Sequence, residues 1–123
     1  VLELKRLLKK DGLLVIAVPN FKSYDAYKYK DDWAAFDVPR HLWHFSRNSI
    51  ERLFEIFSFE VKNVEPLKFD SFYVSLLSEK YRSGRKNIFK GFWNGLLSNF
   101  IARNTKEYSS LTYFLQKSSK KAN

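Results

Sequence analysis

The chain has 123 residues, 45% of them hydrophobic, which is enough for one ordinary domain and too apolar for a disordered segment. It contains no cysteine, which excludes disulfides, thiolate metal sites and cysteine nucleophiles and fits a reducing, cytoplasmic environment. Its formal charge of +9 is uneven, because residues 1–66 hold 11 Lys and Arg against 10 Asp and Glu, whereas residues 67–123 hold 11 against 3.

The start of the chain has the pattern of a helix followed by a buried strand. Leu4, Leu7 and Leu8 fall at helical spacing, and residues 9–12 (KKDG) form a helix stop signal. Residues 13–18 are then an unbroken apolar run, which is typical of a parallel strand covered on both faces. A helix, a glycine turn and a buried strand form the repeating unit of a doubly wound α/β sheet.

Residues 19–46 form a long polar connection that is rich in aromatic residues, and connections of this length are usually functional. Its densest stretch, residues 38–46, contains both histidines of the chain, His41 and His44, together with Trp43. Ligands of open α/β sheets bind beyond the carboxyl ends of the strands. We therefore expect a functional site in this connection.

A helix and a strand are predicted next. The helix begins at Ser46 or Asn48, with Glu51 placed for a capping box on Asn48. Residues 59–64 then alternate apolar and polar, as a half-exposed strand does.

Residues 67–106 are predicted to form two helices. Their apolar residues, at helical spacing, are Phe69, Phe72, Tyr73, Leu76 and Leu77 in the first and Ile88, Phe89, Phe92, Trp93, Leu96, Leu97, Phe100 and Ile101 in the second. The basic turn at residues 83–86 is short enough to make the helices antiparallel neighbours. Both stripes are too wide to leave in water, so we expect them to be buried in a cap over the sheet. Residues 110–116 read as a last strand, followed by a frayed tail.

Three stretches of the chain resemble the C-terminal half of class I S-adenosylmethionine-dependent methyltransferases: residues 8–20, 37–46 and 49–61. The resemblance covers roughly the first half of the chain. It implies a Rossmann-like α/β sheet that is mostly parallel, with an antiparallel last strand. Residues 1–123 would then be a partial methyltransferase domain, with a core in residues 1–66, a helical insertion in 67–106 and the last strand and tail in 107–123.

The resemblance also implies S-adenosylmethionine as the cofactor of the full-length protein. The glycine-rich turn that would hold it is absent, since the four glycines form no cluster. Pro19 and Asn20 would form only the edge of the cofactor site, and Ser58 stands where the family usually has glycine. The chain also lacks methionine, so we expect it to be an inactive piece of a longer protein. The unpaired edge of its sheet would favour self-association.

His41 and His44 are the candidate catalytic residues, because imidazole titrates near neutral pH and can accept a proton from a hydroxyl group. The alternative is that at least one of them ties the loop to the core. Their spacing could suit a metal, but only Asp37 lies near enough to add a ligand, and no metal site is expected.

Four further residues are candidates for substrate binding: Tyr24, Trp33, Arg40 and Trp43. Aromatic walls can position an acceptor in line with a methyl donor, which supplies most of the catalysis that such a displacement needs. Core packing is the alternative for Trp43. Arg40 could clamp an anionic group of the substrate or could pair with Asp37.

The sequence therefore predicts the C-terminal part of a methyltransferase that acts on a small-molecule or amphiphilic acceptor. The alternative is a non-catalytic module whose basic helices bind an anionic membrane surface or an anionic polymer. Nucleic acid is not favoured as a partner, because the aromatic residues fall on helical stripes that are expected to be core.

Overall fold

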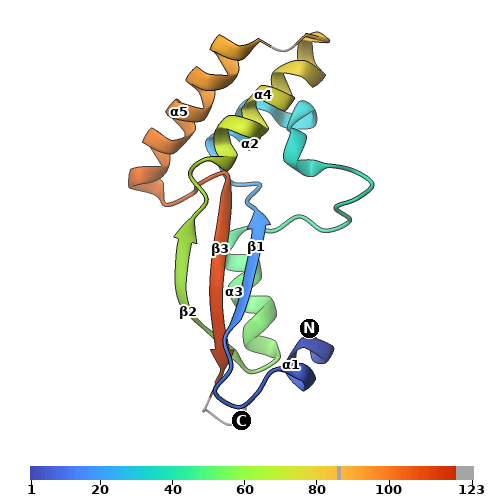
Figure 1. Cartoon of the computed structure of the whole chain (residues 1–123), viewed down its shortest axis with the longest axis vertical. Coiled ribbons are helices and arrows are strands. Elements are labelled where there is room, and N and C mark those ends of the chain that lie inside the picture. Colours follow the sequence, from blue (N-terminus) through green and yellow to red (C-terminus); the bar gives the residue numbers. More distant parts are fainter. Residues whose placement is uncertain (86, 119–123) are drawn as a thin grey trace.

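The computed structural model describes residues 1–85 and 87–118. In these residues, five α-helices and three strands form a mixed α/β fold with two parts (Figure 1). The part that we call the sheet half contains α1 (Leu2–Leu7), β1 (Leu14–Pro19), α3 (Arg47–Ile56), β2 (Phe59–Pro66) and β3 (Ser110–Lys117). The part that we call the cap contains α2 (Tyr24–Tyr29), the short 3₁₀ turns η1 (Lys30–Asp32) and η2 (Ala34–Phe36), α4 (Asp70–Ser83) and α5 (Ile88–Thr105).

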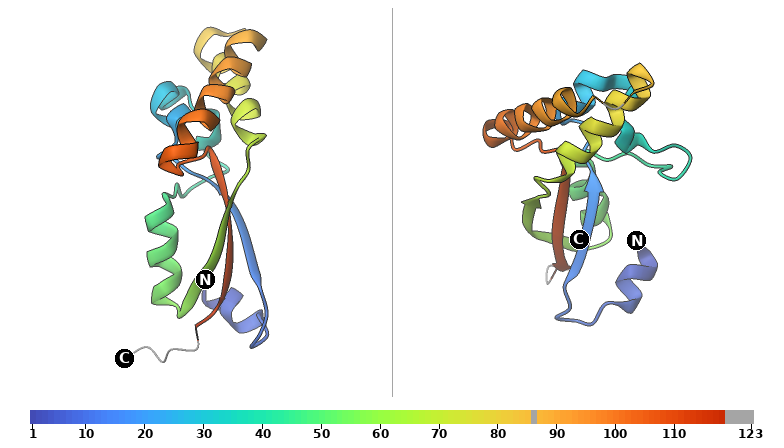
Figure 2. Two further views of the ribbon diagram at one scale, coloured as in Figure 1. Left: turned by 90° about the vertical axis from the view of Figure 1, so that its left-hand side faces the viewer. Right: turned by 45° about the horizontal axis from the view of Figure 1, so that its top comes forward.

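The sheet has the strand order β1-β3-β2, and β3 is antiparallel to both neighbours. β1 and β2 therefore run in the same direction, and their carboxyl ends lie next to the cap (Figure 1). The expectation of a parallel strand covered on both faces is wrong for β1 in this chain. Its partner is antiparallel, and its residues alternate in exposure, because α3 covers only one face of the sheet (Figure 2).

The core of the sheet half is apolar and lies between α3 and the sheet. Its buried residues are Ile50, Phe54, Phe59, Leu111, Tyr113 and Leu115. The rings of Phe54 and Phe59 meet edge to face with 5.6 Å between their centroids, a favourable arrangement for aromatic pairs. Burial of such side chains is the main stabilising contribution in this half.

α3 uses the first of its two predicted starts, two residues before the predicted capping box at Asn48. Ser46 is the N-cap, and its hydroxyl oxygen accepts a hydrogen bond of 3.2 Å from the N–H of Ser49. The Ser49 hydroxyl oxygen in turn accepts a bond of 2.7 Å from the N–H of Ser46. The predicted pairing of Asn48 with Glu51 is therefore wrong, because a serine at N3 closes the box in place of Glu or Gln.

Residues 67–106 form the predicted antiparallel helix pair. The contacts run in opposite directions along α4 and α5, since Gly91 lies against Leu76 and Gly95 lies against Phe72. The two helices lie side by side over the end of the sheet, with α2 beside them (Figures 1 and 2). None of the helices in the described residues is long and apolar enough to cross a membrane.

Three α-helices are followed by residues with a left-handed backbone, α3 by Ser58, α4 by Gly84 and α5 by Lys106 with a φ of 63°. Gly84 follows α4 with a φ of 71°, a conformation that glycine adopts without a steric penalty. Ser58 follows α3 with a φ of 60°, at the position where the resemblance leads one to expect glycine. Lys86, which the sequence also assigned to the turn between α4 and α5, lies outside the described residues, as does most of the expected tail at 117–123.

The expected burial of the apolar stripes is wrong for α5 and holds only in part for α4, in which Phe72, Leu76 and Leu77 are half-buried while Phe69 and Tyr73 are exposed. The buried face of α5 consists of small or polar residues, namely Gly91, Asn94, Gly95, Ser98 and Ala102. The exposed face consists of large apolar ones, among them Ile88, Phe89, Phe92, Trp93, Leu96 and Phe100. Helical periodicity located the helix correctly, but the close approach of α4 and α5 leaves room only for small side chains between them.

Candidate active site at the carboxyl end of β1

Asn20, the first residue after β1, anchors the loop at the carboxyl end of that strand. It is 1% exposed. Its N–H donates to the carbonyl of Ser109, and its side-chain amide donates to Glu107 at 2.6 Å and to the carbonyl of Tyr108 at 3.1 Å. The end of β1 is thus tied to the segment that leads into β3.

The two ends of the long connection meet at this point. Asn20 forms a parallel bridge with Phe45, and the N–H of Phe21 donates to the carbonyl of Phe45 at 3.2 Å. Between these ends the chain forms α2 and the turns η1 and η2, and then residues 37–44, which we call the histidine loop. The predicted long connection therefore contains a helix, which its mixed aromatic and polar sequence did not indicate.

The histidine loop projects from the cap into solvent. Arg40 forms an ion pair with Asp37 at 3.6 Å, although its side chain is 84% exposed, so the guanidinium group is weakly held and open to another anion. Trp43 is 78% exposed. The alternative in which Trp43 packs in the core is therefore wrong, and its ring is accessible to a ligand.

Both histidines are hydrogen-bonded to backbone carbonyl groups at the base of the loop. Nδ1 of His41 lies 3.2 Å from the carbonyl oxygen of Ala35, and Nε2 of His44 lies 3.0 Å from that of Phe36. Because a carbonyl oxygen only accepts, each of these nitrogens must carry the proton. In its neutral form, His41 then has a lone pair on Nε2 and His44 has one on Nδ1.

The two histidines differ in their surroundings. His41 is exposed, whereas His44 is half-buried, with its ring packed edge to face on Phe36 at 4.8 Å. Both residues therefore tie the loop to η2, as one alternative from the sequence proposed. The exposed His41 can in addition present a proton acceptor to a ligand.

Tyr24 and Trp33, the other two predicted substrate contacts, lie in the cap and not in the histidine loop. Trp33 is 1% exposed, and its indole N–H donates to Asp25 at 2.8 Å. Tyr24 is half-buried, and the ammonium group of Lys28 lies 5.9 Å from its ring centre. The structure thus brings together Arg40, His41 and Trp43 but not the whole predicted set, and the substrate contacts of all four residues stay predictions.

A buried carboxylate, which sequence reasoning missed, joins the cap to the sheet half. Asp25 of α2 is fully buried. It accepts hydrogen bonds from Trp33, from the hydroxyl of Ser98 on α5 at 2.8 Å and from that of Ser109, next to β3, at 2.7 Å. Three donors satisfy the carboxylate, so it holds three segments together.

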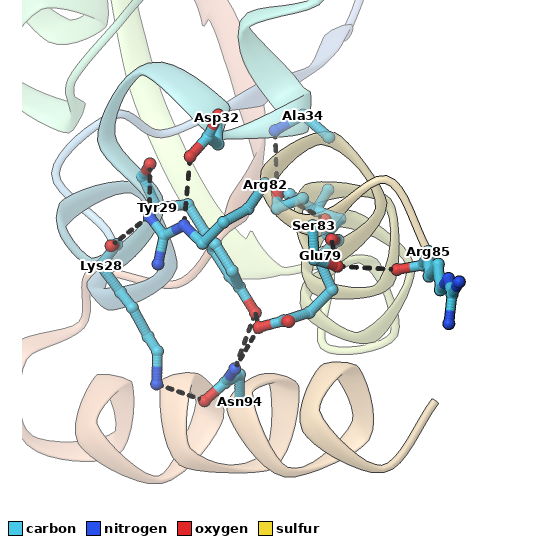
Figure 3. Close-up of polar contacts among 11 residues, drawn as sticks. Lys28, Tyr29, Asp32, Ala34, Glu79, Arg82, Ser83, Arg85 and Asn94 are labelled. Carbon is cyan, nitrogen blue, oxygen red and sulfur yellow. Dashed lines mark hydrogen bonds and ion pairs between the residues drawn. The ribbon is translucent and has the colours of Figure 1, made fainter. Parts of the chain in front are cut away.

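A second polar cluster joins α2, α4 and α5 (Figure 3). The Tyr29 hydroxyl donates to Glu79 at 3.0 Å and accepts from the amide of Asn94 at 2.7 Å, while Lys28 donates to the amide oxygen of Asn94 at 2.6 Å. Burial raises the pKa of Tyr29, so its phenol is neutral at physiological pH. Arg82 completes the cluster by donating to the carbonyl groups of residues 28 and 29.

Both polar clusters could have been detected in the sequence, the one at Tyr29 through Asn94 and the one at Asp25 through Ser98. Asn94 and Ser98 share a helical face with two glycines inside a segment that is otherwise apolar and aromatic. A run of small and polar residues at that spacing indicates a close helix contact.

The residues at the end of β1 do not fit S-adenosylmethionine by themselves. Both polar groups of the Asn20 side chain already form hydrogen bonds within the protein. Its amide nitrogen donates to Glu107, and its amide oxygen accepts from the N–H of Lys22 at 3.1 Å. Two of the four glycines, Gly91 and Gly95, are packed against α4. No glycine cradle for a nucleotide therefore lies among the residues that the structure describes, where no cluster of potential metal ligands occurs either.

No protein-family model matches this chain, and no curated protein matches it. The fold and the geometry of the loop are therefore the observations on which a function can be proposed.

Proposed function

We propose that the chain is the acceptor-side part of an S-adenosylmethionine-dependent methyltransferase and that its histidine loop contacts the methyl acceptor. The observation that carries the proposal is the sheet. β1 and β2 run in one direction with the last strand antiparallel between them, which agrees with the antiparallel last strand that the resemblance implies. The histidine loop ends at the carboxyl end of β1, where Phe45 pairs with Asn20, and this end of the strands is where α/β enzymes bind ligands.

The proposal assigns different roles to the loop residues. Nε2 of His41 accepts a proton from a hydroxyl or similar group of the acceptor, and Trp43 supplies an apolar wall beside it. Arg40 can bind an anionic group of the acceptor. His44 is a positioning residue, because its ring is packed on Phe36 and its N–H is used by a backbone carbonyl.

The cofactor itself must be held by residues other than those of this chain. The edge of the sheet at β1 agrees with the need for further residues. Within the described residues β1 pairs only with β3, and the exposed side chains of Leu13 and Val15 lie along it. We expect a further strand beside β1 in a complete enzyme, and self-association through this edge in the isolated chain. Light scattering at increasing concentration measures that association.

The proposal is tested by comparing the 123-residue chain with its parent polypeptide. In calorimetric titrations, the parent should bind S-adenosylmethionine and the chain alone should not. Micromolar binding to the chain alone would contradict the placement of the cofactor. A parent that neither binds S-adenosylmethionine nor transfers its methyl group would contradict the function.

The roles of the histidines are separated by amide substitutions in the parent. The side-chain N–H of His41→Asn lies where Nδ1 lay and can keep the bond to the Ala35 carbonyl, but it cannot accept the proton, so kcat should fall about a hundredfold with the melting temperature unchanged. His44→Gln can still donate to Phe36 and should keep most of the rate. Equal effects of the two variants on rate would remove the assignment of His41 as the base.

A second candidate function, a basic helical module that binds an anionic surface, is favoured by one observation. The large apolar residues of α5 are exposed, with Phe89 at 90%. Binding through this exposed face of α5 would not depend on methyltransferase activity or on the residues of the histidine loop.

A further inference from the structure

α5 has its large apolar side chains on the outside and its small and polar ones on the inside. Phe89, Trp93, Leu96 and Phe100 follow one another at steps of four, three and four residues, which places them on one line along the helix. All four are exposed, Trp93 at 65% and Phe100 at 63%. We call this line the outer stripe.

The opposite face of α5 is packed against α4 at very short range. A Cβ atom on Gly91 would lie 2.8 Å from the Cα atom of Leu76, and one on Gly95 would lie 2.8 Å from that of Phe72. The hydroxyl of Ser71 donates to the carbonyl of Gly95 at 3.2 Å. Small residues at the contact with large apolar ones outside are the arrangement of helix pairs in lipid, whereas a helix in water has the reverse one.

The outer stripe is bordered by cations. Residues 68–106 contain eight Lys and Arg but only two acidic residues. Both acids are engaged in bonds within the protein, since Asp70 accepts from Ser110 and Glu79 accepts from Tyr29 and Asn94.

Two cavities along the stripe combine apolar and cationic side chains. One of about 310 Å³ is lined by Trp93, Leu96 and Phe100 together with Arg103. The other, of about 610 Å³, is lined by Phe89 and Trp93 together with Lys28, Arg82 and Lys90, and also by Glu79 and Asn94. Cations therefore lie at both ends of the stripe.

We propose that the outer stripe of α5 docks on the surface of an anionic lipid bilayer. The apolar side chains enter the interface, Trp93 lies at the level of the headgroups, and Lys90 and Arg103 bind the anionic headgroups. The helix lies in the plane of the membrane, because it is not apolar enough to cross one.

The charges favour a bilayer over a second copy of the chain. In a dimer formed by two outer stripes, Lys90 and Arg103 of one copy would lie against Lys90 and Arg103 of the other. Like charges would meet whether the two helices were parallel or antiparallel. An anionic surface neutralises these cations instead. Docking on this side also leaves the histidine loop accessible, since the loop lies on the opposite side of the cap from α5 (Figures 1 and 2).

Vesicle co-sedimentation of the chain tests the proposal. The chain should sediment with vesicles of mixed phosphatidylcholine and phosphatidylglycerol, should not sediment with phosphatidylcholine alone, and should be released by salt. Phe89→Ser combined with Trp93→Ser should lower the partition coefficient by at least about tenfold, because two large side chains no longer leave water. Ile56→Ser combined with Leu7→Ser is the matched control, since both side chains are exposed, at 75% and 64%, and lie in the sheet half outside the stripe.

A charge variant and a fluorescence measurement keep the test valid if the double variant fails to fold. Arg103→Glu should weaken binding to anionic vesicles while its circular dichroism stays unchanged. In the Trp43→Phe chain, the emission of Trp93 should shift to shorter wavelength when vesicles are added, and Trp93→Phe in that chain should remove the shift.

Three results would overturn the proposal. The first is the absence of sedimentation with anionic vesicles at low salt, and the second is an equal loss of binding when Ile56→Ser is combined with Leu7→Ser. The third is a dimer, measured by light scattering, that Phe89→Ser dissociates. That dimer would show that the stripe pairs with a second copy. None of these results bears on the binding of S-adenosylmethionine by the parent, so the two proposals can fail separately.

Discussion

The sheet half and the cap each contain a hydrophobic cluster, but α5 is held in place differently from α3. In the sheet half, the buried side chains are aromatic and aliphatic, as in Phe54 of α3 and Leu115 of β3. In the cap, Trp33, Tyr29 and Val74 belong to a second cluster that includes no residue of α5, and α5 buries small and polar residues while its large apolar residues are exposed. Apolar residues in a helix are therefore not evidence of a core when small residues occupy the other face.

The difference also separates folding from binding. In the sheet half, the residues that bury the most apolar surface are the ones that hold the fold. In the cap, directional hydrogen bonds and close backbone contacts hold α5 in place, so its outer residues are available to a partner. The same substitution placed in the sheet-half core and on the outer face of α5 should therefore have different effects on stability.

The largest effect is expected at Asp25. Asp25→Ala removes the acceptor for Trp33, Ser98 and Ser109 and leaves their donors buried without a partner, so the free energy of unfolding should fall by about 4 kcal/mol. Urea denaturation measures the change. Asp31→Ala, at an exposed position, is the control and should change it by less than about 0.5 kcal/mol. A small loss at Asp25 would mean that the network does not hold the cap.

An alkaline transition is expected from the buried tyrosine of the sheet half. Burial raises the pKa of Tyr113 from 10.0 to about 12. Folding therefore favours the protonated phenol, and its contribution to stability is present below pH 10 and lost as the pH rises toward 12, roughly 2–3 kcal/mol in all. Tyr113→Phe should flatten this part of the curve of unfolding free energy against pH. An unchanged curve would mean that Tyr113 ionises without unfolding.

Gly91→Ala should weaken the cap by about 2 kcal/mol, because the new Cβ atom meets the backbone of Leu76 and outweighs the gain in helix propensity. Asn104→Ala, on the exposed end of α5, is the control and should be neutral or slightly stabilising. Thermal unfolding followed by circular dichroism measures both. A stabilised Gly91 variant would show that α4 and α5 can separate without cost.

The smallest effects are expected at two of the left-handed helix ends. Ser58→Gly should stabilise the sheet half by about 1 kcal/mol, since a residue with a Cβ is strained at a positive φ. Gly84→Ala should destabilise the cap by a similar amount for the same reason. Equal signs for the two changes, measured in urea, would contradict the backbone assignment at one of them.

Much of the fold follows from local sequence patterns. The helices at 2–7, 47–56, 70–83 and 88–105 and the strands were predicted from the periodicity of their apolar residues and from turn signals. The antiparallel pairing of β1 with β3 was not predicted from its own residues, because an apolar run carries no information on the direction of its partner. The burial of α5 was predicted the wrong way round, since periodicity identifies two faces of a helix but not which of them a neighbour covers.

Only part of the candidate site could be predicted from the sequence. The density of titratable and aromatic residues in 38–46 indicated the histidine loop, and the structure places this stretch at the expected end of β1. The hydrogen bonds that orient His41 and His44 depend on the backbone of η2, which no side-chain pattern reveals. The burial of Trp33 depends on its hydrogen bond to Asp25. In the sequence, Asp25 has the pattern of an ordinary surface charge, because its burial follows only from the packing of α2.

Large apolar residues of the sheet-half core stabilise the fold, whereas those on the outer stripe of α5 do not. Phe54→Ala and Phe89→Ala, the same substitution at one residue of each set, test this difference when unfolding is measured by urea denaturation without lipid. Phe54→Ala should lower the free energy of unfolding by about 3–5 kcal/mol, because it opens a cavity in the core. Phe89→Ala should change it by less than about 0.5 kcal/mol. Losses of equal size in the two variants would contradict the account.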